Sequence, residues 1–185
     1  MLKKILAVVA LLFAVLLIAI ATRPAQFRVV RSARVAAPPE AVFPLIDDFH
    51  AWTSWSPWEK LDPGLKREYS GAPRGKGAAY AWSGNDDVGS GAMTITDSQP
   101  SERVEIKLEF KTPFEATNVT TFTLRPAAGG TQVEWAMAGD NNFVGKAMSL
   151  FMNMDQMVGK DFEQGLAQLG AAAEARAKSA STQAP

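Results

Sequence analysis

Four side chains in this sequence have the chemistry that an acid or base catalyst would use: Asp155, His50, Tyr80 and Glu134. Each can donate or accept a proton. A group of this kind acts on a substrate only when neighbouring groups position it and adjust its pKa. None of the four has such a partner at a recognisable spacing in the sequence, so no catalytic constellation is predicted.

Metal chemistry has few candidate ligands in this chain. There is no cysteine and a single histidine, His50, whereas protein zinc sites are built mainly from several cysteines and histidines. Lys+Arg and Asp+Glu number 19 each, so the net charge is zero and creates no field for nucleic acid. We therefore expect no metal, no organic cofactor and no nucleic-acid partner.

Asp155 falls on the apolar side of a predicted helix, four residues after Phe151 and three before Val158. A carboxylate in apolar surroundings is costly unless it has a hydrogen-bonding partner. That partner could be a ligand hydroxyl. It could equally be an arginine or a tryptophan N–H of the protein itself, which is the commoner arrangement.

The element that would position these groups is a long helix from Asn142 to about Ala177. Apolar residues recur there at steps of three, four and seven, which places them on one stripe of a helix of roughly nine turns. The stripe consists of Val144, Met148, Phe151, Val158, Phe162, Leu166 and Leu169. Asp140, Asn141 or Asn142 could cap the first turn. A helix with such a stripe must lie against an extended apolar surface.

The preceding chain supplies that surface as short strands separated by turns. Residues 103–111 alternate strictly between apolar and charged side chains, which is typical of a strand with one buried face. Further strands are predicted at 26–36, 65–69, 78–82, 90–98, 116–125 and 131–138, with a short helix at 40–48. We predict an α+β fold of order β-α-α-(six β)-α, in which a curved antiparallel sheet of about seven strands wraps on the long C-terminal helix.

Residues 5–21 form an uninterrupted apolar run behind Lys3 and Lys4. The run just reaches the ~17–25 residues that a membrane-spanning helix needs. A cleavable signal peptide is the alternative, since Ala19-Ile20-Ala21 fits a cleavage site, although Arg23 and Pro24 are poor neighbours for one. We expect an uncleaved anchor with the following domain on the periplasmic or extracytoplasmic side.

The chain then divides into a transmembrane anchor or signal segment (1–25), a ligand-binding domain (26–177) and a disordered tail (178–185).

Several short motifs occur together in the domain. They are Trp52-x-x-Trp55-Ser-Pro57-Trp58, Tyr69-Ser-Gly71 with Gly75-Lys-Gly77, Trp82-Ser-Gly84-Asn85, Gly89-Ser-Gly91 and Asp155-x-x-x-Gly159-Lys-Asp161-Phe162-Glu163-x-Gly165-Leu166. In this combination the sequence resembles the helix-grip fold of the START-like, or SRPBCC, superfamily, and most of all its polyketide cyclase/dehydrase and lipid-transport branch. The resemblance covers residues 27–173. It implies a deep apolar cavity between the sheet and the C-terminal helix, but no particular activity, because relatives include carriers, cyclases and regulators.

With this resemblance we expect inward-facing residues of the sheet and helix to bind an apolar ligand, rather than all to fill a core. The candidates are Trp55, Trp58, Tyr80, Trp82, Ile106, Leu108, Phe110, Phe122, Trp135, Met137, Met148, Phe151, Met152 and Asp155. The cluster of Trp52, Trp55 and Trp58 has three interpretations: a gate at the cavity mouth, a contact with the membrane interface, or a structural cover over the sheet edge.

Three functions remain open at this point. The first is a membrane-tethered carrier that holds a hydrophobic small molecule or a lipid. The second is a cyclase- or dehydratase-like enzyme acting on an apolar substrate in the same cavity. The third is a protein-interaction or stress-regulatory module that binds no ligand.

Overall fold

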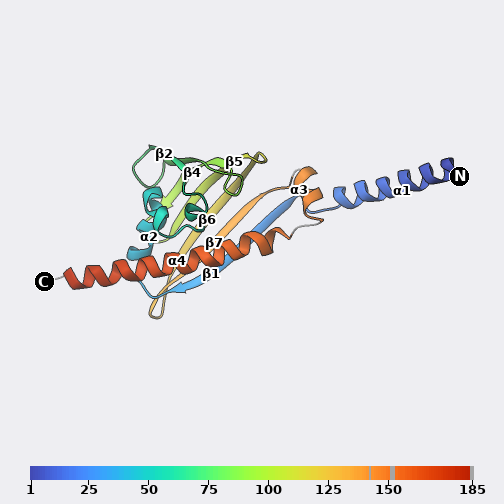
Figure 1. The fold of residues 1–185 in the computed structure, drawn as a ribbon. Helices are drawn as coiled ribbons and strands as arrows, with labels where there is room; N and C mark the ends of the chain where they lie inside the picture. Colours follow the sequence, from blue (N-terminus) through green and yellow to red (C-terminus); the bar gives the residue numbers. More distant parts are fainter. Residues whose placement is uncertain (142, 151–152, 184–185) are drawn as a thin grey trace.

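The structure is a computed structural model that describes residues 1–141, 143–150 and 153–183. Helix α1 (Leu2–Ala21) extends away from a domain built of a sheet and helices (Figure 1). The domain begins with β1 (Gln26–Val35), α2 (Pro39–Asp47) and the 3-10 helices η1 (Phe49–Ser54) and η2 (Pro57–Lys60). Six strands follow: β2 (Lys66–Gly71), β3 (Ala78–Ser83), β4 (Ser90–Gln99), β5 (Arg103–Thr112), β6 (Ala116–Ala127) and β7 (Gly130–Asp140). Helices α3 (Phe143–Met148) and α4 (Met154–Gln183) complete the chain.

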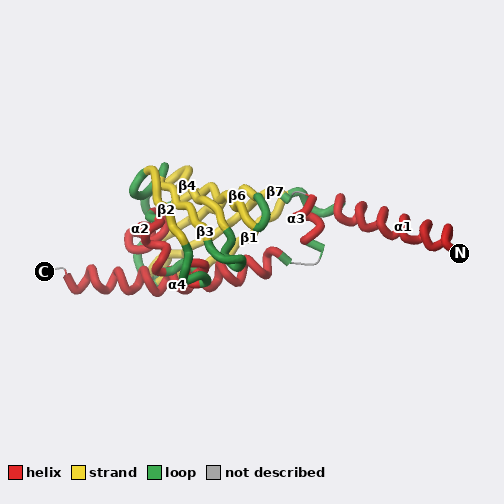
Figure 2. Tube along the Cα trace, turned by 45° about the horizontal axis from the view of Figure 1, so that its top comes forward, coloured by secondary structure: helices red, strands yellow, loops and turns green. Residues whose placement is uncertain are grey.

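The seven strands form one antiparallel sheet in the order β1-β7-β6-β5-β4-β3-β2. Consecutive strands from β2 to β7 are neighbours, and β1 joins the far edge by pairing with β7. Helices α2 and α4 contact each other, and α4 runs along the sheet against β1 and β7 (Figure 2). This confirms the predicted α+β helix-grip fold, its strand count and its element order.

The single helix predicted from Asn142 to about Ala177 is wrong in its first part. Helix α3 ends at Met148, and α4 begins only at Met154. The side-chain oxygen of Asn153 accepts a hydrogen bond from the Gln156 amide at 3.2 Å, so Asn153 caps α4. The cap predicted among residues 140–142 would precede α3, and Asn142 lies outside the described residues. Helix α4 also continues to Gln183, so residues 178–183 of the predicted disordered tail are helical.

The apolar stripe of α4 packs against the sheet from Val158 onward. Phe162, Leu166, Leu169 and Ala173 are all buried, whereas Val144 of α3 is exposed. The ring of Phe162 stacks on Trp135 with 4.0 Å between centroids. A Cβ at Gly165 would lie 2.7 Å from Cζ3 of Trp135, so glycine is what lets α4 approach the sheet this closely.

Helix α1 has almost no contact with the domain. Its apolar side chains are exposed except for Ile20, near the end where α1 meets α3. Within the described residues, α1 is the one helix that is long and apolar enough to cross a membrane.

Candidate functional site

A cavity of about 390 Å³ lies between the sheet and α4. This is within the ~300–1,000 Å³ range of small-molecule sites in proteins. Its apolar wall is formed by Trp52, Trp58, Leu65, Tyr80, Trp82, Val88, Gly89, Met93, Leu108, Phe110, Pro113, Trp135, Met137, Met157, Val158 and Phe162. Its polar groups come from Ser56, Glu59, Asp86, Asp87, Thr112, Thr120 and Asp161. The wall is therefore mainly aromatic and aliphatic with a few polar positions.

Alternation along the strands places the wall residues. Side chains two positions apart share a face, so β3 and β7 each contribute a pair to the cavity, and β5 contributes Leu108, Phe110 and Thr112. On β7, Trp135 lies opposite Phe122 and Met137 lies opposite Thr120 of β6. From the other side α4 contributes Val158 and Phe162, four residues apart on one helix face.

The structure separates the predicted site residues into several groups. Those that line the cavity are Trp58, Tyr80, Trp82, Leu108, Phe110, Trp135 and Met137. Trp55, Ile106 and Phe122 are fully buried in the core instead. Met148 lies in α3 and is absent from the described cavity wall. Phe151 and Met152 lie outside the described residues.

The tryptophan cluster is fixed to the end of α2. Trp52 Nε1 donates to the Ile46 carbonyl at 3.0 Å, and Trp55 Nε1 donates to the Leu45 carbonyl at 2.7 Å. These bonds satisfy carbonyl groups that a helix end leaves without intrahelical partners. Trp58 is only half-buried, and it meets Trp135 edge-on. Trp52 and Trp55 are thus fixed to α2 by hydrogen bonds, and both Trp52 and Trp58 line the cavity.

Asp155 is paired with an arginine and does not reach the described cavity wall. Its carboxylate accepts two hydrogen bonds from Arg31 of β1, at 3.0 and 3.1 Å, and 55% of its side chain is exposed. The guanidinium holds the pKa of Asp155 below its usual value. Of the partners considered from the sequence, a ligand hydroxyl, an arginine or a tryptophan N–H, the structure has the arginine.

A buried acidic residue that the sequence gave no reason to select lies in the wall. Glu59 of η2 accepts a hydrogen bond from the Tyr80 hydroxyl at 2.7 Å and from Arg67 Nε at 2.7 Å. Burial, and then the bond to Glu59, raise the pKa of the Tyr80 phenol. Tyr80 is therefore held protonated and cannot serve as a base near neutral pH.

Trp135 and Asp161 contribute polar groups to the wall that have no protein partner among the described residues. The indole Nε1 of Trp135 is buried and has no hydrogen-bond acceptor among the described residues. Asp161 of α4 also lines the cavity, makes no side-chain hydrogen bond within the described residues, and has its pKa raised by burial. A bound molecule with polar atoms could satisfy both groups.

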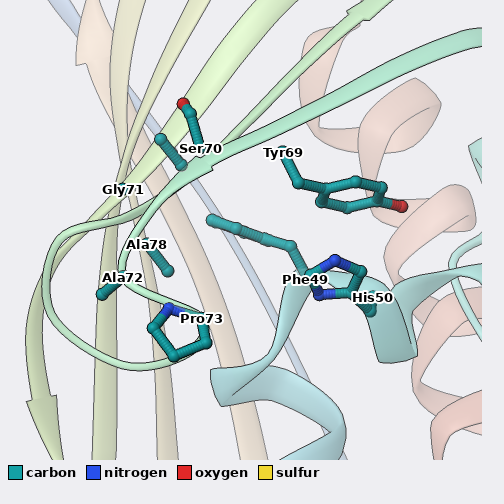
Figure 3. A pocket seen from close by; sticks show the side chains of 9 residues that line it. Phe49, His50, Tyr69, Ser70, Gly71, Ala72, Pro73 and Ala78 are labelled. Carbon is teal, nitrogen blue, oxygen red and sulfur yellow. The ribbon is translucent and has the colours of Figure 1, made fainter.

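A second, smaller depression of about 210 Å³ lies beside β2 and η1. Figure 3 shows the imidazole of His50 facing the ring of Tyr69, with 4.0 Å between the two centroids. His50 Nδ1 lies 2.9 Å from the Asp48 carboxylate. This depression shares no described lining residue with the cavity, so His50 cannot act on a molecule bound there.

The remaining candidates for acid–base or metal chemistry also lie apart from the cavity. Glu134 is on the outer side of the sheet, 3.9 Å from Arg28. Among the described residues, no group of three or more His, Cys, Asp or Glu side chains could hold a metal ion.

Comparison with known proteins gives both a family match and structural neighbours. A family model described as polyketide cyclase/dehydrase and lipid transport matches residues 26–174. A crystal structure of a Chromobacterium violaceum protein is 21% identical with a TM-score of 0.58, covering 82% of this chain and 99% of that one. A Mesorhizobium loti protein is 18% identical with a TM-score of 0.56, covering 80% and 97%.

The di-domain ARO/CYC protein BexL, from a biosynthetic pathway, is another structural neighbour. It is 13% identical with a TM-score of 0.62, covering 84% of this chain and 52% of BexL. No curated protein matches the chain. At these identities the structural likeness establishes the fold alone.

Proposed function

Because the chain belongs to the polyketide cyclase/dehydrase and lipid transport family, we propose that it is a membrane-tethered binding protein for an apolar small molecule or a lipid. The ligand occupies the cavity between the sheet and α4. Its contacts are the predicted residues that line this cavity: Trp58, Tyr80, Trp82, Leu108, Phe110, Trp135 and Met137.

The observation that carries this proposal is the cavity itself. Its wall is largely aromatic and aliphatic, and the buried indole Nε1 of Trp135, a residue of this wall, has no hydrogen-bond partner in the described part of the chain. Burial of apolar surface gains ~25 cal/mol per Å², so a ligand that buries about 250 Å² gains about 6 kcal/mol before the entropy of association is subtracted. The unpaired N–H favours a ligand that carries an oxygen acceptor on an otherwise apolar body.

Helix α1 supports the tether. Twenty residues of α1, nearly all exposed in the structure, match the hydrocarbon thickness of a bilayer. Tethering raises the effective concentration of the domain near membrane-dissolved ligands. The domain then samples a lipid phase that a free domain would meet only by diffusion.

Native mass spectrometry of the full chain tests the binding function. The protein is purified in detergent from its own membranes, and we expect a discrete added mass that is lost on denaturation. Leu108→Trp should abolish this adduct by filling the cavity, whereas Lys107→Trp, on the exposed face of the same strand, should retain it. A clean apo mass for the unmodified protein, even after incubation with host lipids, would count against the proposal and favour an interaction module.

An enzyme of the cyclase or dehydratase type is a second candidate, favoured by Asp161. Its carboxyl group faces the cavity, and burial raises its pKa, as general acids require. If the protein is an enzyme, Asp161→Asn should keep the adduct and abolish its chemical conversion, followed as a change in adduct mass over time. If the adduct of the unmodified protein is not converted over time, the enzyme candidate is rejected and the carrier function is the one that remains.

A further inference from the structure

All seven strands share one end of the sheet, and that end is next to α1. Register pairs join Gln26 to Asp140, Lys66 to Ser83 and Ser90 to Thr112 at this end. Helix α1 ends at Ala21, and four residues, 22–25, separate it from the first of these strand positions. Helix α3 lies beside α1 there, as Figure 1 shows. We refer to this part of the domain as the α1 end.

The cavity opens at the α1 end. Five exposed wall residues lie at this end. Asp86 and Asp87 are in the loop between β3 and β4, and Met157 is in the first turn of α4. Thr112 is the last residue of β5, and Pro113 follows it. These are the exposed members of the described cavity wall, while its other members are buried or half-buried. A ligand can therefore reach the cavity most directly from the side of the domain on which α1 lies.

Exposed apolar side chains lie on the elements and loops of the α1 end. The rim, as we define it, consists of Leu61, Phe114, Phe143, Val144, Met154 and Met157. Phe114 and Phe143 are each 58% exposed, and Leu61 is 50% exposed. Leu61 belongs to the α1 end because the next residue, Asp62, accepts a hydrogen bond from the Asn85 amide at 2.7 Å. Within the described residues, Val119 of β6 is the exposed large apolar side chain of the domain that lies outside the rim.

We infer that the rim rests in the interface of the bilayer that holds α1, so that the cavity opens directly into lipid. This inference rests on the proposed tether. Burying exposed apolar side chains in the boundary between headgroups and acyl chains is favourable, and such patches on a soluble surface mark interaction sites. The occupant is lipid rather than a protein partner because only residues 22–25 separate α1 from β1, whose first residue pairs with Asp140, three positions before Phe143 of the rim.

The charges near the opening indicate how the rim would bind. Asp86 and Asp87 are close to it, and so are Lys60 and Lys111, so both signs are present. Attraction to anionic headgroups is therefore not the main force, and the contact should form on zwitterionic lipid and persist in salt. An apolar molecule could then pass between bilayer and cavity without crossing water.

Depth measurements on the full chain test the inference directly. The chain has no cysteine, so single spin labels can be attached to Phe114→Cys, Val144→Cys and, as a control at the opposite end, Ala128→Cys in the turn between β6 and β7. In phosphatidylcholine vesicles, the labels at 114 and 144 should collide mainly with oxygen, and the label at 128 with a water-soluble nickel chelate. Labels at 114 and 144 as exposed to the chelate as the label at 128 would overturn the inference.

Transfer kinetics give a second readout. The double variant Phe114→Asp with Phe143→Asp should slow the passage of N-phenylnaphthylamine between vesicles and the protein about tenfold, because charges oppose insertion of the rim. Its affinity for the same probe in detergent should not change, and Ala128→Asp should transfer at the original rate. Unaltered transfer by the double variant would contradict the inference.

The two proposals can fail separately. If no probe binds in detergent, the binding function fails, and the spin labels still decide where the rim lies. If the full chain does not float with vesicles, both the tether and the rim contact are refuted, and binding in detergent stands.

Discussion

The ring of Trp135 stabilises the fold, whereas its unpaired indole N–H lowers the stability of the fold. Its ring packs between Phe162 of α4 and Phe122 of β6, with centroid distances of 4.0 and 4.7 Å, which stabilises the contact between helix and sheet. Its Nε1 is buried without an acceptor, which costs about 1–3 kcal/mol in the empty protein. Because Trp135 also lines the cavity, we propose that this N–H meets an acceptor of the ligand in the bound state.

Trp135→Phe should separate these roles. The ring contacts largely remain and the unpaired donor is lost, so we expect urea unfolding in detergent to show equal or slightly higher stability. The affinity for an acceptor-bearing ligand should fall about 5–10-fold, the equivalent of one hydrogen bond. Trp55→Phe is the matched control, because its Nε1 is bonded to the Leu45 carbonyl and its loss should cost about 1–3 kcal/mol of stability. Equal ligand affinity for Trp135→Phe and the original protein would contradict a ligand role for this N–H.

Asp161 predicts a pH dependence of stability. Its pKa is raised in the fold by burial, so the folded protein holds this proton at pH values where the unfolded chain, with a pKa near ~3.9, has released it. The stability that this bound proton contributes is fully present below the pKa that Asp161 has in the unfolded chain. It is lost as the pH rises through the pKa that Asp161 has in the folded protein. Asp161→Asn should therefore be more stable than the original protein at pH 7, with the difference disappearing below about pH 4.

Asp155→Asn gives the control of opposite sign. Arg31 lowers the pKa of Asp155, so its contribution is present above the unfolded pKa and is lost as pH falls through the folded pKa. This variant should be less stable than the original protein at pH 7. The midpoints of urea unfolding, measured from pH 3.5 to 7.5, compare both variants with the original protein. If both variants shift the midpoint in the same direction at pH 7, the opposite pKa shifts assigned to Asp161 and Asp155 are refuted.

At the scale of elements, the start of α4 is held to β1 by Arg31. The guanidinium bonds to Asp155 and, at 2.7 Å, to Glu163, and it lies directly over Gly159. A side chain at position 159 would collide with it. The glycine thus permits a close approach of strand and helix next to the cavity, and its backbone conformation is not the reason for it.

Gly159→Ala tests this contact. Alanine is the better helix former by about 1 kcal/mol, yet we expect a net loss of about 1–2 kcal/mol because the ion pair must move. Gly170→Ala on the same helix is the control: its Cβ would meet Val35 at an ordinary 3.5 Å, so it should be neutral or stabilising. Thermal unfolding in detergent measures both, and stabilisation by both substitutions would show that Arg31 does not restrict position 159.

For the whole molecule, the fate of α1 decides whether the protein stays at the membrane. We expect the full chain to resist alkaline carbonate extraction and its intact mass to include residues 1–25. Leu11→Lys with Val15→Lys should release it, because each charge at the centre of a spanning helix costs ~2.5–3.5 kcal/mol. A mature chain that starts after Ala21 would instead identify residues 1–21 as a signal peptide.

The sequence alone determined the class of fold and the side of each strand that faces inward. Strict alternation in residues 103–111 and the helical period of Val158, Phe162, Leu166 and Leu169 depend only on local geometry, so they could be read without a structure. The uninterrupted apolar run of residues 5–21 likewise needs no tertiary information. Alternation along the predicted strands also placed Trp82, Leu108, Phe110, Trp135 and Met137 on the face of the sheet toward the long helix.

Only the tertiary structure decided which inward side chains border the cavity and which fill the core. Ile106 and Leu108 share one strand and one face, yet Ile106 is fully buried and Leu108 lines the cavity. Asp155 meets Arg31 across 124 positions of the chain, and Glu59 meets Tyr80 across 21. Local periodicity reports the face on which a side chain lies, but a partner or a cavity depends on how distant elements pack, and no spacing in the sequence encodes that.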